Sequence, residues 1–218
     1  MTNASIRELA RFYLTKLQEV DWPEVYRRAI IDHPQSVAAL CGLGETGDHS
    51  DVIAVRGYLE SPLPRLRRAA VRAFGNLGRE SVMVDLAKYL QDDSPAVVRE
   101  VSKQLQKSPA ALDGERLFRV VLEADRQHVR DTALRLIFAT GKWRSLPWLI
   151  RSAAHCDGQT AEHAQELVEA WFTPPRCNRI FTNPSPAERQ LIIGALNDSR
   201  RLIDRTFVEK LEFWVKVS

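Results

Sequence analysis

The chain has 218 residues, of which 44% are hydrophobic and 27% are charged, as in an ordinary globular protein. Its net charge is only +3, because 28 acidic residues are interspersed with 31 lysines and arginines, so the composition permits nucleic-acid binding without indicating it. The cysteines Cys41, Cys156 and Cys177 have no paired spacing and predict free thiols. No run of residues resembles a signal peptide or a membrane span, which predicts a cytoplasmic protein with no membrane partner.

The first 33 residues predict two helices. Ser5 and Glu8 have the spacing of a capping box and open a helix with an apolar face, formed by Ile6, Leu9, Phe12, Tyr13 and Leu17. A second, shorter helix is predicted from Asp21 to about Ile31, and His33-Pro34 ends it. We interpret residues 1–33 as a degenerate first repeat or an N-terminal cap.

Residues 34–172 repeat with a period of 31, which is clearest between Ser61 and Arg99. A helix is predicted from Pro64 to Gly78, with Gly78 as a left-handed C-cap, and a second apolar run follows from Val82 to Leu90. Several positions 31 residues apart carry similar residue types, and each period holds two helical patterns, which is the signature of stacked helix pairs. The apolar set predicted to be buried in equivalent positions is Phe74, Leu105 and Leu136.

The period breaks after Phe172, and residues 173–218 are predicted to hold an irregular insertion followed by C-terminal cap helices. Ser185 and Glu188 form a second capping-box pattern. A last helix is predicted to begin at Asp198, with an apolar side formed by Leu202, Ile203, Phe207, Leu211, Trp214 and Val215.

The segment Pro64–Gly78 resembles the first helix of a HEAT-like repeat, of the short variety found in phycobilisome-lyase-like proteins. Asp93–Arg99 is similar to the Asp/Pro/Val-Arg opening of such a repeat, and Asp125–Arg130 is similar to it without the proline. The resemblance covers roughly residues 35–172. It implies one all-α domain over residues 1–218, an α-solenoid superhelix of about five HEAT-like helix pairs with helical caps at both ends. It does not specify a function.

Three arginines, Arg68, Arg99 and Arg130, recur at intervals of 31 residues. The resemblance implies that they are a structural ladder, bonding to acidic groups or helix ends of neighbouring repeats. An anion-binding role is the alternative.

The exposed side of the second helices is the predicted partner-binding strip, since these helices line the concave surface of HEAT-like arrays. Tyrosine and arginine are typical anchors of protein interfaces. Acidic residues also lie on this strip, so it does not resemble a track for phosphates. The predicted binding residues are Tyr58, Lys88, Tyr89, Arg116, Arg119, Trp143 and Arg151.

No catalytic, metal or cofactor site is predicted. His155, Cys156, Asp157, His163 and Cys177 are of metal-ligand type but fit no known ligand spacing. Gly42–Gly47 lacks the strand and the lysine of a phosphate-binding loop. Trp148 and Trp171 are expected to be packing residues.

These observations favour a non-enzymatic scaffold, adaptor or immunity-type inhibitor that docks another protein or a peptide segment on its concave face. A DNA glycosylase built from HEAT-like repeats, or another nucleic-acid-binding protein, is an alternative hypothesis, and Trp143, Trp148, Trp171 and Asp157 are available for the glycosylase. A lyase or chaperone for tetrapyrrole-bearing proteins is a second alternative, which the repeat type alone implies. The sequence leaves the oligomeric state open.

Overall fold

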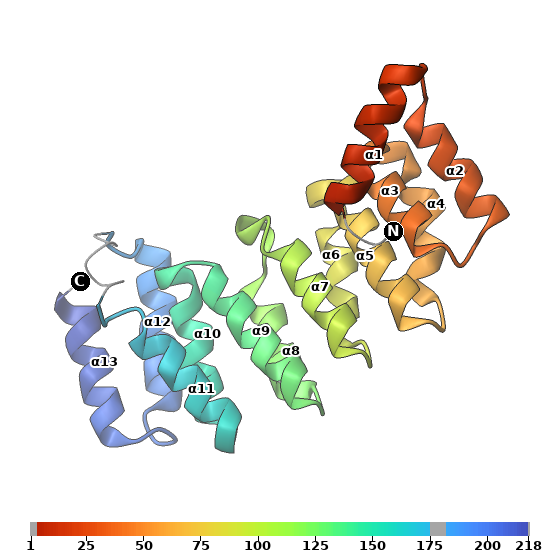
Figure 1. Cartoon of the computed structure of the whole chain (residues 1–218). Helices are drawn as coiled ribbons and strands as arrows, with labels where there is room; N and C mark the ends of the chain where they lie inside the picture. Colours follow the sequence, from red (N-terminus) through yellow and green to blue (C-terminus); the bar gives the residue numbers. More distant parts are fainter. Residues whose placement is uncertain (1–3, 175–181, 218) are drawn as a thin grey trace. The chain divides into compact units, whose positions relative to one another are not determined.

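The computed structural model describes residues 4–174 and 182–217, the last four of these by their backbone only. The described residues are helices and their connections, with no strand among them. The chain divides into two compact units, residues 1–108 and 109–218, and each is a stack of helices (Figure 1). The fold is therefore all-α and of the solenoid class, as the repeat pattern predicts. A single domain over the whole chain stays a prediction.

The first unit contains five longer helices. In two of its helix pairs, the second helix is built differently from these. Each of these two second helices is a short α-helical turn continued by a 3₁₀ helix. The longer helices are α1 (Ala4–Leu17), α2 (Trp22–Asp32), α3 (Val37–Thr46), α5 (Pro64–Gly78) and α7 (Pro95–Leu105). The short elements are η1 (His49–Asp51), α4 (Val52–Arg56), η2 (Gly57–Glu60), η3 (Arg79–Val82), α6 (Met83–Ala87) and η4 (Lys88–Gln91).

The second unit has longer second helices. Its elements are η5 (Pro109–Ala111), α8 (Gly114–Glu123), α9 (Gln127–Ala139), α10 (Lys142–His155), α11 (Gly158–Glu169), α12 (Pro186–Ser199) and α13 (Arg205–Val217). Helix α10 packs against α8, α9, α11 and α12, so it lies at the centre of this unit.

The repeat frame places the core correctly. Phe74, Leu105 and Leu136 come from the first helices α5, α7 and α9, and each is at most 1% exposed. Leu59 and Leu90, which are 31 residues apart on the second helices, are buried in the same way. The prediction of equivalent buried positions is confirmed, because a side chain repeated at the period of the stack meets the same neighbours in each layer.

Of the two predicted capping boxes, the one on α12 is present and the one on α1 is not. The Asp21 side chain accepts a hydrogen bond from the Glu24 amide at the start of α2, and Ser185 and Glu188 form a complete capping box on α12. The prediction of Ser5 as the first N-cap is wrong, because α1 begins at Ala4 and includes Ser5.

The last helix begins later than predicted. Helix α12 ends at Ser199, and α13 starts only at Arg205, so Leu202 and Ile203 lie in the connection between them. The Asp204 side chain accepts a hydrogen bond from the Phe207 amide 3.2 Å away, which caps the new helix. Trp214, Val215 and Lys216 lie in α13, but their side chains are outside the described residues, as are Pro175, Arg176 and Cys177 of the insertion.

Candidate functional site

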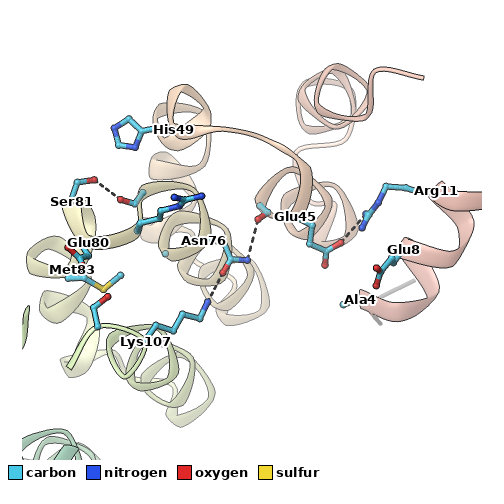
Figure 2. A pocket seen from close by; sticks show the side chains of 15 residues that line it. Ala4, Glu8, Arg11, Glu45, His49, Asn76, Glu80, Ser81, Met83 and Lys107 are labelled. Atoms are coloured by element: carbon cyan, nitrogen blue, oxygen red, sulfur yellow. Dashed lines mark hydrogen bonds and ion pairs between the residues drawn. The ribbon is translucent and has the colours of Figure 1, made fainter. Parts of the chain in front are cut away.

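A groove of about 1100 Å³ opens in the first unit where α3 and α5 end (Figure 2). Helix α1 contributes Ala4, Glu8 and Arg11 to its lining. The segment that follows α5 contributes Arg79, Glu80 and Ser81, and α7 with its following turn contributes Lys107 and Ser108. Side chains from three successive repeats therefore meet around one hollow.

The floor of the groove depends on two glycines that are 31 residues apart. A Cβ atom on Gly44 of α3 would lie 2.5 Å from the Cα atom of Ala73, and one on Gly75 of α5 would lie 2.7 Å from the Gln104 amide oxygen. The missing side chains let successive first helices approach closely at this end of the stack.

Three polar residues occupy the same repeat position along this floor, namely Glu45, Asn76 and Lys107. The Asn76 Nδ2 atom donates to the Gly44 carbonyl at 3.2 Å, and Lys107 Nζ donates to Asn76 Oδ1 at 2.7 Å. Lys107 also donates to Gln104 Oε1 at 2.6 Å (Figure 2 shows the Asn76 contacts). The side chains of Asn76 and Lys107, which follow the 31-residue period, therefore link three successive repeats.

Lys107 is the most distinctive charge in the groove. Its ammonium group is bonded to two neutral amide oxygens, and no carboxylate lies within ion-pair distance of it among the described residues. Partial desolvation lowers the pKa of Lys107 from its ordinary value, because the charge of the Glu100 carboxylate compensates only in part for the lost hydration. An ammonium group has three N–H bonds, so one donor remains for an incoming group.

Arg79 holds an unusual backbone conformation at the edge of the groove. Its φ is 49° and its ψ is −131°, a region that residues other than glycine rarely adopt. The prediction of Gly78 as a left-handed C-cap is wrong, since Gly78 has a φ of −88° and the positive φ falls on the next residue. Gly78 is needed for a different reason, because a Cβ there would lie 2.2 Å from Val82.

The formal charges around the groove are mixed. Glu8, Glu45 and Glu80 oppose Arg11, Arg79 and Lys107. Arg11 Nη1 lies 3.0 Å from Glu45 Oε2, which neutralises one pair. The side chains of Glu8, Glu80 and Arg79 make no hydrogen bond or ion pair with any residue that the structure describes. The lining is suited to a partner that carries charges of both signs.

The predicted binding residues of the first unit are partly engaged in linking repeats. The Tyr58 hydroxyl lies 3.4 Å from the Ile30 carbonyl, and the Tyr89 hydroxyl donates to Glu60 at 2.6 Å. Burial and the Glu60 carboxylate together raise the pKa of Tyr89 to about 12. Lys88 is exposed, and its Nζ atom lies 3.0 Å from Asp85. Lys88 and Tyr89 also line a smaller hollow of about 510 Å³.

The predicted binding residues of the second unit differ in their exposure. Arg116 and Arg119 of α8 are exposed, in helical ion pairs with Asp113 and Glu115. Arg151 of α10 is half-buried, with Asp198 3.1 Å away. Trp143 is 6% exposed, and its indole N–H donates to the Thr182 carbonyl at 2.8 Å. Trp143 is therefore a packing residue that cannot reach a partner, which corrects its inclusion in the strip.

Two other tryptophans, Trp171 and Trp148, face inward to different degrees. Trp171 is 7% exposed, as predicted, and donates to Ser145 Oγ at 3.0 Å. Trp148 is half-buried between Phe118, at a ring separation of 6.0 Å, and the Arg151 guanidinium.

The arginine ladder makes three different contacts. Arg68 lies 3.7 Å from Glu100 of the next repeat, and Arg130 donates to the Ala124 carbonyl at the end of α8 at 2.6 Å. Arg99 donates to the Pro95 carbonyl of its own helix and links no repeats through that bond. The equal spacing thus does not give equal partners.

Other arginines hold the repeats together at closer range, and the 31-residue frame gave no signal for them. The pairs between elements are Arg27–Asp51 at 2.6 Å, Arg67–Asp92 at 2.7 Å and Arg72–Glu100 at 2.7 Å. Asn76 and Lys107 could have been found, because they share the repeat position of Glu45. Arg79 could not, since no residue pattern marks its backbone conformation.

No group of three metal-ligating side chains lies close together within residues 4–174 and 182–213. In the described part of the chain, none of the helices combines the length and apolar character of a membrane span.

Comparison with curated proteins gives no match. A family model described as HEAT repeats matches residues 23–106 and again residues 54–137, which together make up more than half of the chain. The phycobilisome-lyase subtype stays a prediction. HEAT repeats commonly act as surfaces for protein interaction. The matched span and the stacked helix pairs agree, and the chain belongs to the HEAT repeat family.

Proposed function

We propose that this protein is a non-enzymatic scaffold or adaptor that binds a segment of another protein, and that the groove in the first unit is its principal docking site. The observation that carries the proposal is the state of Lys107, an ammonium group bonded only to neutral amides in a groove of about 1100 Å³. A carboxylate on the partner would complete its coordination with a charge-assisted hydrogen bond.

The mixed lining supports a peptide partner over a nucleic acid. Phosphate backbones are bound by many basic groups acting together. The groove instead offers the acidic Glu8 and Glu80 beside Lys107 and Arg79. A peptide segment with an acidic residue flanked by basic ones would match this arrangement. We propose Lys88 in the first unit, and Arg116 and Arg119 in the second unit, as further partner-binding residues. All three are exposed and lie on the second helix of their repeat.

The alternatives find less support. The glycosylase hypothesis needs aromatic rings free to stack on a base, whereas Trp143 and Trp171 are buried and hydrogen-bonded. No observation favours a tetrapyrrole lyase.

The test is a differential capture. Immobilised wild-type protein and the Lys107→Gln variant are incubated with lysate, and the bound proteins are compared by quantitative mass spectrometry. Lys103→Gln is the matched control, because Lys103 is also an exposed lysine and lies four residues earlier, in the last turn of α7. We expect a partner that is lost from Lys107→Gln and retained by Lys103→Gln. Equal recovery on all three proteins would contradict the proposal.

A further inference from the structure

Helix α1 has its apolar face turned to solvent. The large side chains of this face are 47–81% exposed, and they are Ile6, Leu9, Phe12, Tyr13 and Leu17. The sequence pattern of an amphipathic helix is present as predicted, but the residue that α1 buries is Arg7, at 5% exposure. Helices of soluble proteins normally place their apolar face against the core and their charged residues towards solvent.

Arginines hold α1 in this orientation. Arg7 forms a two-pronged pair with Glu45 of α3, through Nε at 3.1 Å and through Nη2. Arg11 reaches the same carboxylate at 3.0 Å and the Tyr26 hydroxyl at 3.3 Å. One acceptor, Glu45, therefore fixes the polar face of α1 inward, and this leaves the apolar face without a neighbour in the described structure.

The exposed face is large enough for a weak but specific interface. A helix of 14 residues is about 21 Å long, and its half-exposed large side chains present apolar surface on the order of 500 Å². That is near the upper end of the largest patch on a typical monomer. Two such faces together approach the roughly 1,000 Å² that a biological interface must bury.

The charges on α1 favour a protein surface over a membrane. Amphipathic helices that bind membranes carry free lysines and arginines on their polar face. Two of the three basic residues of α1, Arg7 and Arg11, are already paired with Glu45, which leaves Lys16 as the one basic residue of α1 without a carboxylate partner among the described residues. Little positive charge is left to attract anionic lipid.

The same helix from a second copy is complementary to it. Glu8 and Lys16 each lie four residues from Phe12, on opposite sides. In an antiparallel contact centred on Phe12, Glu8 of one copy is level with Lys16 of the other, and the twofold axis makes this happen twice. Glu8 has no ion pair among the residues that the structure describes, so it is available for this contact.

We propose that α1 is a dimerisation element, and that two copies of the chain associate through an antiparallel α1–α1 contact that covers Leu9, Phe12 and Tyr13. This interface shares Glu8 with the lining of the groove but does not include Asn76 or Lys107, and it does not depend on the proposed function.

Sedimentation equilibrium of the full chain tests the contact. We expect a monomer–dimer equilibrium in the micromolar range, and a dimer at least about tenfold weaker for the double variant Leu9→Glu/Tyr13→Glu. Ile53→Glu is the control, because Ile53 of α4 is 83% exposed on the same unit, and it should dimerise like wild type. A monomeric wild type, or equal loss in the Ile53 control, would overturn the proposal.

Cysteine cross-linking keeps the test valid if the double variant fails to fold. In a background with Cys156→Ser and Cys177→Ser, Phe12→Cys should form a disulfide-linked dimer on mild oxidation, whereas Ile53→Cys should remain uncross-linked. Flotation with phosphatidylserine vesicles tests the alternative that a membrane surface covers the apolar face of α1. Recovery of wild-type chain on vesicles without any Phe12→Cys cross-link would show that a membrane covers α1 instead.

Discussion

Arg72 and Glu100 form a two-pronged ion pair between α5 and α7, with Nε–Oε1 at 3.0 Å and Nη2–Oε2 at 2.7 Å. Glu100 is only 4% exposed. Burial alone would raise the pKa of Glu100, but the hydrogen bonds from Arg72 and Gln104 outweigh it and hold that pKa below its ordinary value. The pair is therefore a structural link between two repeats.

The first prediction is that Arg72→Met lowers the free energy of unfolding by about 3 kcal/mol, because it leaves a buried carboxylate with weaker compensation. The double variant Arg72→Met/Glu100→Gln should recover most of the loss. Urea unfolding at neutral pH measures both. If the double variant is as unstable as the single one, the loss comes from packing and not from the uncompensated charge.

The same pair predicts an acid-sensitive contribution to stability. Since the pKa of Glu100 is lower in the folded than in the unfolded chain, its contribution is present above the unfolded value of about 4.3. It is lost as the pH falls from there through the folded pKa. Glu100→Gln should flatten the fall of unfolding free energy in that window. If the unfolding free energies of wild type and variant fell in parallel as the pH is lowered, the prediction would be contradicted.

Tyr89 predicts the opposite behaviour at high pH. Its folded pKa of about 12 lies above the ordinary value near 10, so its contribution is present below pH 10 and is lost between about pH 10 and 12. Tyr89→Phe should be less sensitive to alkali than wild type in this interval. Thermal unfolding across the interval measures the difference, and an equally steep loss of stability in wild type and variant would contradict the prediction.

The sequence predicts the fold well because the fold depends on repetition. Phe74 and Leu105 could be assigned to the core from their spacing alone, since each layer of a stack repeats the environment of the last. The polar contacts are less predictable. Arg68 and Arg99 share a frame but find different partners, because a long side chain reaches whatever acceptor the neighbouring helix offers.

The groove could not be predicted from the binding residues that the sequence suggests, because none of them is among its described lining residues. Lys88 and Tyr89, which follow from the repeat frame, line the smaller hollow instead, and the Tyr89 hydroxyl is used within the stack. Lys107 was missed because a lysine on a helix end is ordinary in sequence, and its significance lies in having amides and no carboxylate beside it. The outward orientation of the apolar face of α1 could not be predicted either, because a hydrophobic pattern identifies the apolar face but not what covers it.

The core itself gives a further prediction. Phe74→Ala should cost about 3–5 kcal/mol of unfolding free energy, since the ring is 1% exposed and its removal leaves a cavity. Chemical denaturation is the measurement. A loss below about 1 kcal/mol would mean that the repeats can repack around the missing ring.

The C-terminal helix predicts an effect on solubility. Phe207, Val208 and Leu211 of α13 are buried, so deletion of residues 201–218 should expose apolar surface of the preceding helices and cause aggregation. Light scattering of the truncated and full chains at equal concentration measures this. Equal scattering from the two chains would remove the role of α13 as a cap.

Arg79 connects backbone strain with the proposed groove. A φ of 49° with a ψ of −131° costs a residue other than glycine on the order of 1–3 kcal/mol. Arg79→Gly should therefore raise the free energy of unfolding by about 1 kcal/mol, whereas Arg79→Ala, which keeps the Cβ atom, should leave it nearly unchanged.

If the guanidinium contacts a partner in the groove, both variants should weaken binding by a similar factor, because both remove the side chain. Denaturant unfolding and a binding titration on the same three proteins separate the two effects. Stabilisation by alanine as large as that by glycine would show that Arg79 is strained by its side chain and not by its backbone.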